Sequence, residues 1–403
     1  MRVLMIAPEP FFSPRGTPIS IYFRLQALSR LGIEIDLLTY HLGDDVHFPG
    51  VRIFRTAAIP FVRKVKVGPS YIKPFLDLLV WVKALAMLAG GRYDLIHAHE
   101  EAAYFALPLA RMFGVKLLYD MHSSLPQQLA NYGFANYGPL VDLFSRLERS
   151  VLRRAGAVIT ICPDLDRHVE SLGAGEKSFL IENFAVAELP ADYQRSADRL
   201  KERYDLEGKL VITYTGTFER NQGLDLLVRG SSRVVAEFPQ AVYLMVGGRA
   251  DQLESLRAMA VEEGVGEHFL FTGPQPFEDI PVFLWISDLL VSPRSHGTNT
   301  PLKIYSYLAS GRPIVATDMQ THRQVLTDET AMLVPPNAEG LSEGIRRLLG
   351  DAALRERIGQ GGRHAAGESF SYQSYLSRIQ EVFDYLNGRE TEGVPVPDRS
   401  SVR

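Results

Sequence analysis

The sequence predicts an α/β protein with two doubly wound, Rossmann-like domains that face each other across a cleft. Short apolar runs rich in β-branched residues alternate along the whole chain with longer segments of helical periodicity. The chain has 403 residues, which is too long for one ordinary core, so we expect two domains. In such domains ligands bind at the carboxyl ends of the parallel strands.

The strand-like runs of the first half lie at 3–7, 35–39, 51–54, 95–99, 115–120, 157–161 and 179–181. Those of the second half lie at 210–216, 241–248, 268–273, 289–293, 313–317 and 331–335. Helical candidates between them are 18–31, 102–113, 140–154, 223–237, 251–263, 301–310 and 340–349. Strand and helix alternating in this way predict two parallel sheets with helices on both faces.

The change-over between the two series is a polar stretch with little strand character, residues 184–209. We therefore place the first domain at 1–187 and the second at 188–370. An aromatic-rich helix at 371–387 follows and is expected to pack against another element. The polar, proline-containing tail 388–403 is expected to be disordered.

Composition and missing motifs exclude several classes of function. The 43 basic and 47 acidic residues give a net charge of −4, which argues against a dedicated nucleic-acid binder. One cysteine excludes a disulfide framework and a multi-cysteine zinc site. The turn after the first strand has one glycine, Gly16, which disfavours NAD, and neither a P-loop nor a G-x-S-x-G motif occurs. The chain has neither a signal peptide nor a spanning apolar run, so we expect a cytoplasmic protein.

The segment "SHGTNTPLKIYSYLASG" (295–311) predicts a short capped helix. Thr300 is suited to the N-cap, Pro301 to the first helical position and Gly311 to the position after the end. The expected apolar stripe comprises Leu302, Tyr305, Leu308 and Ala309. Lys303 lies in the first turn, where the helix dipole disfavours a cation. An anionic ligand nearby would explain this arrangement.

A second anion-binding signal is the strand–glycine turn–helix of 214–227, whose backbone N–H groups suit a phosphate. If this turn and the 297–301 loop both lie at the carboxyl edge of the sheet, they bracket one phosphate-sized space. Lys303 can reach that space, with Arg220 and Arg294 as further candidates. The alternative is that Lys303 is simply solvated.

Polar residues also follow two strands of the first domain. In "HAHEE" (97–101) the two histidines share one side of a strand end, which is more typical of a packed, hydrogen-bonded pair than of a metal site. In "YDMHSSLP" (119–126) the polar residues Asp120, His122 and Ser123 come at the carboxyl edge, where we expect them to face a crevice.

Basic residues interleave with an apolar run at 60–92. The pattern predicts either an interfacial helix that meets an anionic membrane or a crossover helix buried on the sheet. One helix can do both with opposite faces.

The ordered set of motifs resembles a known family over nearly the whole chain. It comprises SPRGTP, LSRLGIEIDLLT, DLIHAH, YDMHS, AVITI, IENFA, VGGRADQLESL, FTGPQPFEDIPVFLWISDLLVSPR and the helix 301–310. Single motifs are unspecific, but together and in this order they are similar to the GT-B-fold retaining glycosyltransferases of glycosyltransferase family 4.

The resemblance implies transfer of a sugar from a nucleotide-diphosphate sugar, with retention of configuration, no cofactor and no obligatory metal. The second domain would bind the donor, with base and ribose near Pro274–Pro276. The first would bind the acceptor, and the last helix would pack back on it. His122 and Lys303 take the catalytic positions. The expected donor-side residues are Gly16, Thr17, Gly216, Thr217, Arg220, Gln222, Arg294, Thr298, Thr300, Pro301, Leu302 and Ser306. The expected acceptor-side residues are His99, Glu100, Asp120 and Ser123.

The sequence departs from the family pattern at four donor positions. Thr217 and Gln222 replace the family's Arg and Lys, and Thr298 and Ser306 replace its two glutamates. Lys303 with Arg220 or Arg294 would compensate the lost charge, which indicates a divergent branch. The alternatives are a non-catalytic sugar-nucleotide or lipid-binding protein and a sugar-nucleotide epimerase. We expect a lipid-linked or cell-envelope glycan acceptor, with 60–92 contacting the inner face of the membrane.

Overall fold

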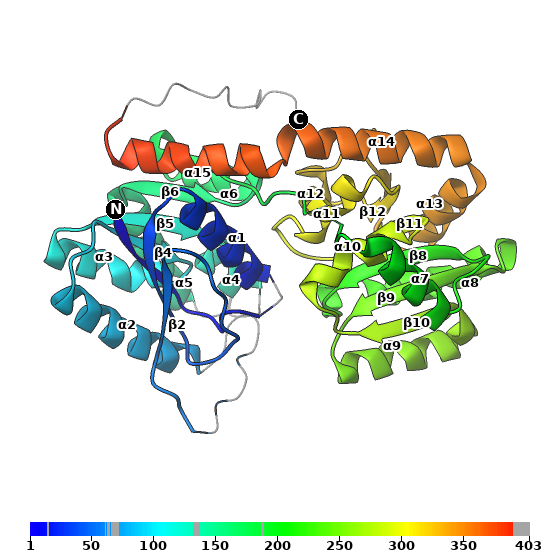
Figure 1. Ribbon diagram of the computed structural model, residues 1–403, viewed down its shortest axis with the longest axis horizontal. Helices are drawn as coiled ribbons and strands as arrows, with labels where there is room; N and C mark the ends of the chain where they lie inside the picture. The colour runs from blue at the N-terminus through cyan, green and yellow to red at the C-terminus, as the bar shows by residue number, and fades with distance from the viewer. Residues whose placement is uncertain are drawn as a thin grey trace. The chain divides into compact units, whose positions relative to one another are not determined.

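The computed structural model describes residues 1–13, 16–60, 62, 65, 72–131, 138–186 and 189–389. The chain divides into two compact units (Figure 1). Unit 1 comprises Met1–Glu182 and Tyr375–Arg403, and unit 2 comprises Asn183–Ser374. The boundary that the sequence suggests, 187–188, falls on two residues outside the described part.

Unit 1 is built on a seven-stranded parallel sheet of order β3-β2-β1-β4-β5-β6-β7. Its strands are β1 (Arg2–Ala7), β2 (Glu34–Thr39), β3 (Val51–Arg55), β4 (Leu95–His99), β5 (Lys116–Met121), β6 (Ala157–Thr160) and β7 (Ser178–Leu180). Its helices are α1 (Gly16–Arg30), α2 (Lys73–Gly90), α3 (Ala102–Phe113), α4 (Leu125–Asn131), α5 (Gly138–Arg154), α6 (Pro163–Ser171) and α15 (Tyr372–Leu386).

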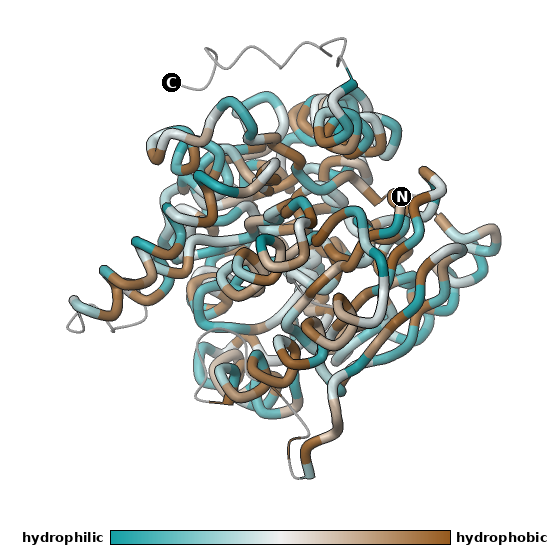
Figure 2. Tube along the Cα trace, turned by 90° about the vertical axis from the view of Figure 1, so that its left-hand side faces the viewer, coloured by the Kyte–Doolittle hydropathy of each residue, from teal (hydrophilic) through white to brown (hydrophobic). Residues whose placement is uncertain are grey.

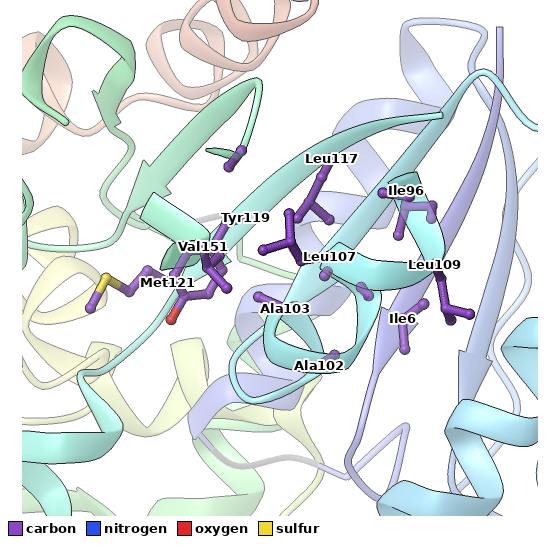
Figure 3. Close-up of a cluster of buried hydrophobic side chains, with 14 of the residues drawn as sticks. Ile6, Ile96, Ala102, Ala103, Leu107, Leu109, Leu117, Tyr119, Met121 and Val151 are labelled. Atoms are coloured by element: carbon purple, nitrogen blue, oxygen red, sulfur yellow. The ribbon is translucent and has the colours of Figure 1, made fainter. Parts of the chain in front are cut away.

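The core of unit 1 lies between the sheet and the helices α2, α3 and α5. Ile96 and Leu117 of the sheet face Ala103 and Leu107 of α3 (Figure 3). On the other face, α1 and α15 are joined where the Arg24 guanidinium lies over the ring of Tyr375, 5.3 Å from its centroid. The helices alternate hydrophobic and hydrophilic colouring along their length, as expected of helices that cover a sheet (Figure 2).

Unit 2 has a six-stranded parallel sheet of order β10-β9-β8-β11-β12-β13. Its strands are β8 (Leu210–Gly216), β9 (Ala241–Gly247), β10 (Phe269–Gly273), β11 (Leu289–Ser292), β12 (Ile314–Thr317) and β13 (Met332–Val334). Its helices are α7 (Tyr193–Arg203), α8 (Leu224–Glu237), α9 (Ala250–Glu262), α10 (Ile280–Trp285), α11 (Lys303–Ser310), α12 (Gln320–Arg323), α13 (Ala338–Gly350) and α14 (Ala352–Ser369). Both sheets and all the predicted strands are thus confirmed.

The start of α11 corrects a prediction. The helix begins at Lys303, with Leu302 as N-cap and no side-chain capping bond, so Thr300 is not its cap. Ile304 N donates to Pro301 O at 3.0 Å, which forms a tight entry turn instead. The predicted left-handed end at Gly311 is confirmed, with φ 68°.

The buried face of α11 also differs from the predicted stripe. Ile304 and Tyr307 are buried, whereas Leu302 and Ala309 are only half-buried. The reason is that the tyrosine hydroxyl reaches the neighbouring strand, where it accepts a hydrogen bond from the backbone N–H of Thr215 at 2.9 Å.

The sequence did not predict α14, because glycine disfavours helices. In the structure these glycines allow close helix packing. A Cβ on Gly359 would lie 2.2 Å from Gly311 O, and one on Gly361 would lie 2.4 Å from Glu329 O. The tail that the sequence predicts to be disordered is 388–403, and its residues 390–403 lie outside the described residues.

Candidate functional site

Two loops of unit 2 meet at the carboxyl edge of its sheet. They follow β8 and β11, which are neighbours in the sheet. Ser295 N donates to Asn221 O at 3.0 Å and so ties one loop to the other. Gly223 has φ 66°, and a Cβ there would lie 2.0 Å from Pro293 O, so only glycine permits this approach. The loops that the sequence predicts to bracket an anion site therefore lie together.

Lys303 is the central cation of this edge. Its ammonium lies over the ring of Tyr214, 3.6 Å from the centroid, and donates to Gln222 Oε1 at 3.1 Å. Gly216 borders it closely, since a Cβ there would lie 3.3 Å from the Lys303 Nζ. Burial and the charge of Arg294 hold the pKa of Lys303 well below its usual range. Among the described residues no ion pair joins Lys303 to a carboxylate, so its charge has no counterion within this part of the chain.

Arg294 is the second cation of this centre. Its Nε donates to His296 O at 2.8 Å. The guanidinium packs on Gly297, which has φ 124°, and a Cβ there would lie 2.1 Å from the Arg294 Nη2. The glycine therefore makes room for this guanidinium.

His322 adjoins the two cations, and the sequence did not single it out. Its Nδ1–H donates to Thr317 O at 2.7 Å, so its Nε2 accepts from the Ser292 hydroxyl at 2.9 Å. Burial, with the charges of Arg294 and Lys303, lowers the pKa of His322 to about 4. At neutral pH His322 is therefore neutral and adds no further charge beside the two cations. The only sequence signal was its position just after a strand.

The structure brings together Gly216, Gln222, Arg294 and Lys303 from the predicted donor side. Arg220, Thr217 and Thr298 are exposed, and the carbonyl of Thr217 accepts from the Tyr214 hydroxyl at 2.7 Å. Thr300 is buried, with no hydrogen-bond partner for its hydroxyl among the described residues. Pro301 is buried, while Leu302 and Ser306 are half-buried.

In unit 1, the polar residues of β4 and β5 gather around the carboxylate of Asp120. Arg24 of α1 donates to it at 2.9 Å, and the Nε2–H of His97 donates at 3.0 Å. The Nε2 of His122 lies 3.2 Å from the other carboxylate oxygen. His99 stacks on His97, with ring centroids 4.6 Å apart, and its Nδ1 lies 3.0 Å from the His122 Nε2. The predicted packed histidine pair is therefore present.

All these side chains are buried, and the neighbourhood sets their charges. Burial alone would raise the pKa of Asp120, but Arg24 and the histidines hold it well below its usual range. Burial lowers the pKa of His97 and, further, that of His99. Burial acts the same way on His122, but Asp120 outweighs it and raises the pKa of that histidine. His99 and Asp120, expected on the acceptor side, have no exposed surface, so the structure places them behind the site.

Glu100 is the partly exposed acid of this edge. Its backbone has φ 50°, a conformation that L-residues rarely adopt and that concentrates at functional sites. Ser123 Oγ donates to its carboxylate at 2.8 Å. Burial, only partly offset by His122, raises the pKa of Glu100 to about 8. Gly16 and Thr17, expected on the donor side, are the first residues of α1. Residues 14 and 15 of the same motif lie outside the described residues.

His97, His99 and Asp120 are close enough to hold a metal ion. Their chemistry fits one poorly, because Arg24 already neutralises the single carboxylate. The distal nitrogens His97 Nδ1 and His99 Nε2 also lack hydrogen-bond partners in the described structure, whereas metal-binding histidines anchor that nitrogen. The cluster is therefore better described as an ion pair with histidine donors.

Comparison with known proteins gives two family matches. Residues 196–365 match the family described as "Glycosyl transferases group 1", and residues 25–182 match the "Glycosyl transferase 4-like domain". The alpha-D-kanosaminyltransferase of Streptomyces kanamyceticus is 24% identical over 322 residues, 76% of this chain and 81% of the relative. The phosphatidyl-myo-inositol mannosyltransferase of Mycobacterium tuberculosis is 25% identical over 402 residues, 96% and 98% of the two chains.

Two solved structures share the fold. Sucrose-phosphate synthase from Thermosynechococcus elongatus has a TM-score of 0.79 at 21% identity, covering 96% of this chain and 99% of its own. HepE of Anabaena, solved with UDP, has a TM-score of 0.73 at 16% identity, covering 95% and 100%. At these identities the likeness shows the architecture alone.

Proposed function

Because this chain belongs to the family 4 glycosyltransferases with the GT-B fold, we propose that it transfers a sugar from a nucleotide-diphosphate sugar with retention of configuration. Unit 2 binds the donor, and unit 1 supplies the acceptor-side residues Glu100 and Ser123 and the sugar-contacting His122. The observation that carries the proposal is the centre formed by Lys303 and Arg294, in which the half-buried ammonium of Lys303 has no carboxylate partner in the described chain.

A diphosphate suits this centre by charge and by shape. Lys303 lies against Gly216, whose lack of a side chain lets a phosphate approach the backbone, and the charge of Arg294 acts on Lys303. The start of α11 has no side-chain cap, so the N–H groups of its first turn other than that of Ile304, which donates to Pro301 O, are available to the same anion. Charge-assisted hydrogen bonds of this kind are worth about 1.5–3 kcal/mol each.

The same groups act on the chemical step. Negative charge grows on the diphosphate as the bond to the sugar breaks, and preorganised cations and N–H dipoles stabilise it. Lys303 and Arg294 supply the neutralisation that a divalent ion supplies elsewhere, so the transfer proceeds without a cofactor or an obligatory metal. Ser306, in the place of a family glutamate, gives the ribose a weaker hydrogen bond than a carboxylate would.

The names of the relatives support the donor class. HepE was solved with UDP and with UDP-glucose. The mannosyltransferases include one whose name gives GDP-mannose dependence. These names agree on a nucleoside diphosphate and differ in base and sugar, so the proposal extends to the diphosphate and leaves the base open.

The test is a panel of nucleoside mono- and diphosphates with a thermal-shift readout, followed by transfer assays. We expect diphosphates to raise the unfolding temperature through binding to the native state. Lys303→Ala should abolish the shift, and Lys209→Ala, which removes an exposed lysine of unit 2, should keep it. No shift with any diphosphate would refute the donor site. Binding without transfer or hydrolysis would indicate a non-catalytic binding protein, and product without an acceptor would indicate an epimerase.

We further propose that the acceptor is lipid-linked and that α2 contacts the inner face of the membrane. This helix buries Leu76, Val80, Ala84 and Leu88 on unit 1, so the predicted crossover helix is present. Its outer face exposes Phe75, Leu78 and Val82 at 52%, 52% and 51%. No helix in the described ranges is long and apolar enough to cross a bilayer. An apolar face of this kind suits interfacial binding instead.

The charged residues of α2 are all directed to partners inside unit 1, which leaves the outer face apolar. Lys73 pairs with Glu101 at 2.5 Å, the Tyr40 hydroxyl donates to Asp77 at 2.5 Å, and Lys83 donates to Arg55 O. The basic residues Arg63, Lys64 and Lys66 lie outside the described residues. The name of the mycobacterial phosphatidyl-myo-inositol mannosyltransferase supports a lipid acceptor.

Co-sedimentation with vesicles of anionic and of neutral lipid tests this contact. We expect binding to anionic vesicles that weakens with salt. Leu78→Glu with Val82→Glu should abolish it, while Val261→Glu, at a position 67% exposed in unit 2, should not. Equal binding of the wild type and the double variant would contradict the proposal.

A further inference from the structure

The Asp120 cluster does more than fill the interior of unit 1. Three histidines adjoin one carboxylate, and each has a different charge environment. Asp120 is bonded to His97 and to His122, while His99 lies 3.7 Å from it. The pKa of His122 alone among the three is raised.

The groups that face His122 come from three elements. Asp120 is on β5, His99 is on β4 with Glu100 following it, and Arg24 is on α1. The two acids favour the imidazolium form of His122, while Arg24 opposes it. The balance therefore depends on how Asp120 divides its interactions between Arg24 and His122.

The hydrogen bonds also select a tautomer. A carboxylate only accepts, so the Nε2 of His122, 3.2 Å from an Asp120 oxygen, must carry a proton. The same Nε2 lies 3.0 Å from the His99 Nδ1.

We propose that Asp120 is a positioning residue, which holds His122 with its proton on Nε2 and favours its imidazolium form, with Arg24 as the buried counterion that limits this effect. The inference rests on the proposed function only for its consequence: His122 then meets the transferred sugar as a hydrogen-bond donor. The ion pair spans 96 residues of sequence and joins β5 to α1, and Tyr375 of α15 lies against the same guanidinium.

The experiment follows the histidine side chains of the full chain by proton–nitrogen NMR after labelling, with His122 assigned from His122→Gln. In the wild type we expect the Nε2-protonated tautomer in the neutral form. Asp120→Asn should lower the pKa of His122 and mix its tautomers. Arg24→Gln should shift that pKa in the opposite direction, upward, because it removes the opposing charge.

Opposite shifts distinguish positioning from a merely structural role, which would move both variants in the same way. Asp36→Asn is the matched control, because Asp36 is also buried in unit 1 and bonded to Arg52 at 2.7 Å. It should leave the titration of His122 unchanged. If Asp120→Asn does not fold, Arg24→Gln still tests whether the pKa of His122 shifts upward. An unchanged titration in either folded variant, or stoichiometric zinc that is lost in Asp120→Asn, overturns the inference.

Activity provides an independent readout. If transfer needs the imidazolium form, kcat falls as the pH rises through the pKa of His122. In Asp120→Asn this fall should move to lower pH, with the KM for the donor little changed. The NMR arm needs no substrate, so an inactive wild type would count against the proposed function and leave the inference standing.

Discussion

The two polar centres of this molecule occupy equivalent places and balance their charge differently. Each lies at the carboxyl edge of a parallel sheet, one in unit 1 and one in unit 2. In unit 1 the buried carboxylate of Asp120 has its counterion, Arg24, 2.9 Å away. In unit 2 the ammonium of Lys303 has an aromatic ring and an amide oxygen but, within the described chain, no carboxylate.

This difference separates a centre whose carboxylate has a counterion from one whose ammonium has, in the described chain, only an amide oxygen and an aromatic ring as partners. The carboxylate of Asp120 already has Arg24 as its counterion, so we expect the Asp120 cluster to position His122 and not to bind a charged ligand. A buried ammonium without a counterion is costly, and it shifts its pKa until an anion arrives. The substrate phosphates are therefore expected at unit 2.

The largest expected effect is a difference in how much a substitution at each centre lowers the free energy of unfolding. Asp120→Ala leaves the Arg24 charge buried and unpaired, which should lower the free energy of unfolding by about 3–5 kcal/mol. Lys303→Ala removes a charge that has no carboxylate partner among the described residues, so it should change that free energy by less than about 1 kcal/mol. Urea denaturation measures both. Equal decreases in the free energy of unfolding for the two variants would contradict the proposed difference in charge pairing between the two centres.

The next effect concerns the pH dependence of nucleotide binding. Burial and Arg294 hold the pKa of free Lys303 well below its usual range, and a bound phosphate raises it. Affinity should therefore be constant below the free-state pKa and fall above it, by up to about tenfold per pH unit, until the bound-state pKa is reached.

Calorimetry in buffers of different ionisation enthalpy would detect the proton taken up on binding. Lys303→Arg, which stays charged, should lose this component of the pH dependence. A slope identical in the variant would assign the effect to the nucleotide itself.

A smaller effect is expected at Glu100, an acid of unit 1 for which burial outweighs the opposing charge of His122. Its pKa is raised from 4.5 to about 8, so the folded state binds more protons than the unfolded state between those values. Stability contributed by this group is thus present at low pH and is lost as the pH rises through this window. Glu100→Gln should remove the loss and stabilise the protein by about 1–2 kcal/mol at pH 8. A variant no more stable than the wild type at pH 8 would contradict this.

The smallest effect tests the second cation of unit 2. Gly297→Ala places a Cβ 2.1 Å from the Arg294 Nη2 and must displace that guanidinium. We expect nucleotide affinity to fall by about tenfold or less, since one exposed cation contact weakens. Gly264→Ala is the matched control, because Gly264 also has a positive φ, 72°, but nothing within 4 Å of an added Cβ. A loss common to both variants would point to backbone strain instead.

Much of the architecture was predictable because its signals are local. Apolar runs of the right length predicted each strand within one residue of its ends. Polar residues at a strand end predicted the edge where Asp120 and His122 lie. The glycine turn after residue 214 and the loop before the helix 301–310 predicted the edge where Lys303 lies. The glycine turn at 216 and the end of α11 at Gly311 were predicted from the left-handed or unhindered backbone that only glycine favours.

What the sequence missed depends on contacts between distant residues. The sequence analysis did not single out Arg24, because nothing local in the sequence linked it to Asp120. The start of α11 shifted from the predicted cap because the entry turn closes on Pro301. Helix α14 was hidden by the glycines that let it pack on Gly311 and on residue 329.

The sequence by itself determined the order of strands and helices, the two parallel sheets and the glycines at their turns, since periodicity and backbone preference act over a few residues. Only the tertiary structure decided which charges have partners. Whether an ammonium or a carboxylate is stable when buried depends on atoms brought within a few ångströms from other elements. In this chain folding brings Arg24 to Asp120 and leaves Lys303 facing Gln222 and Tyr214.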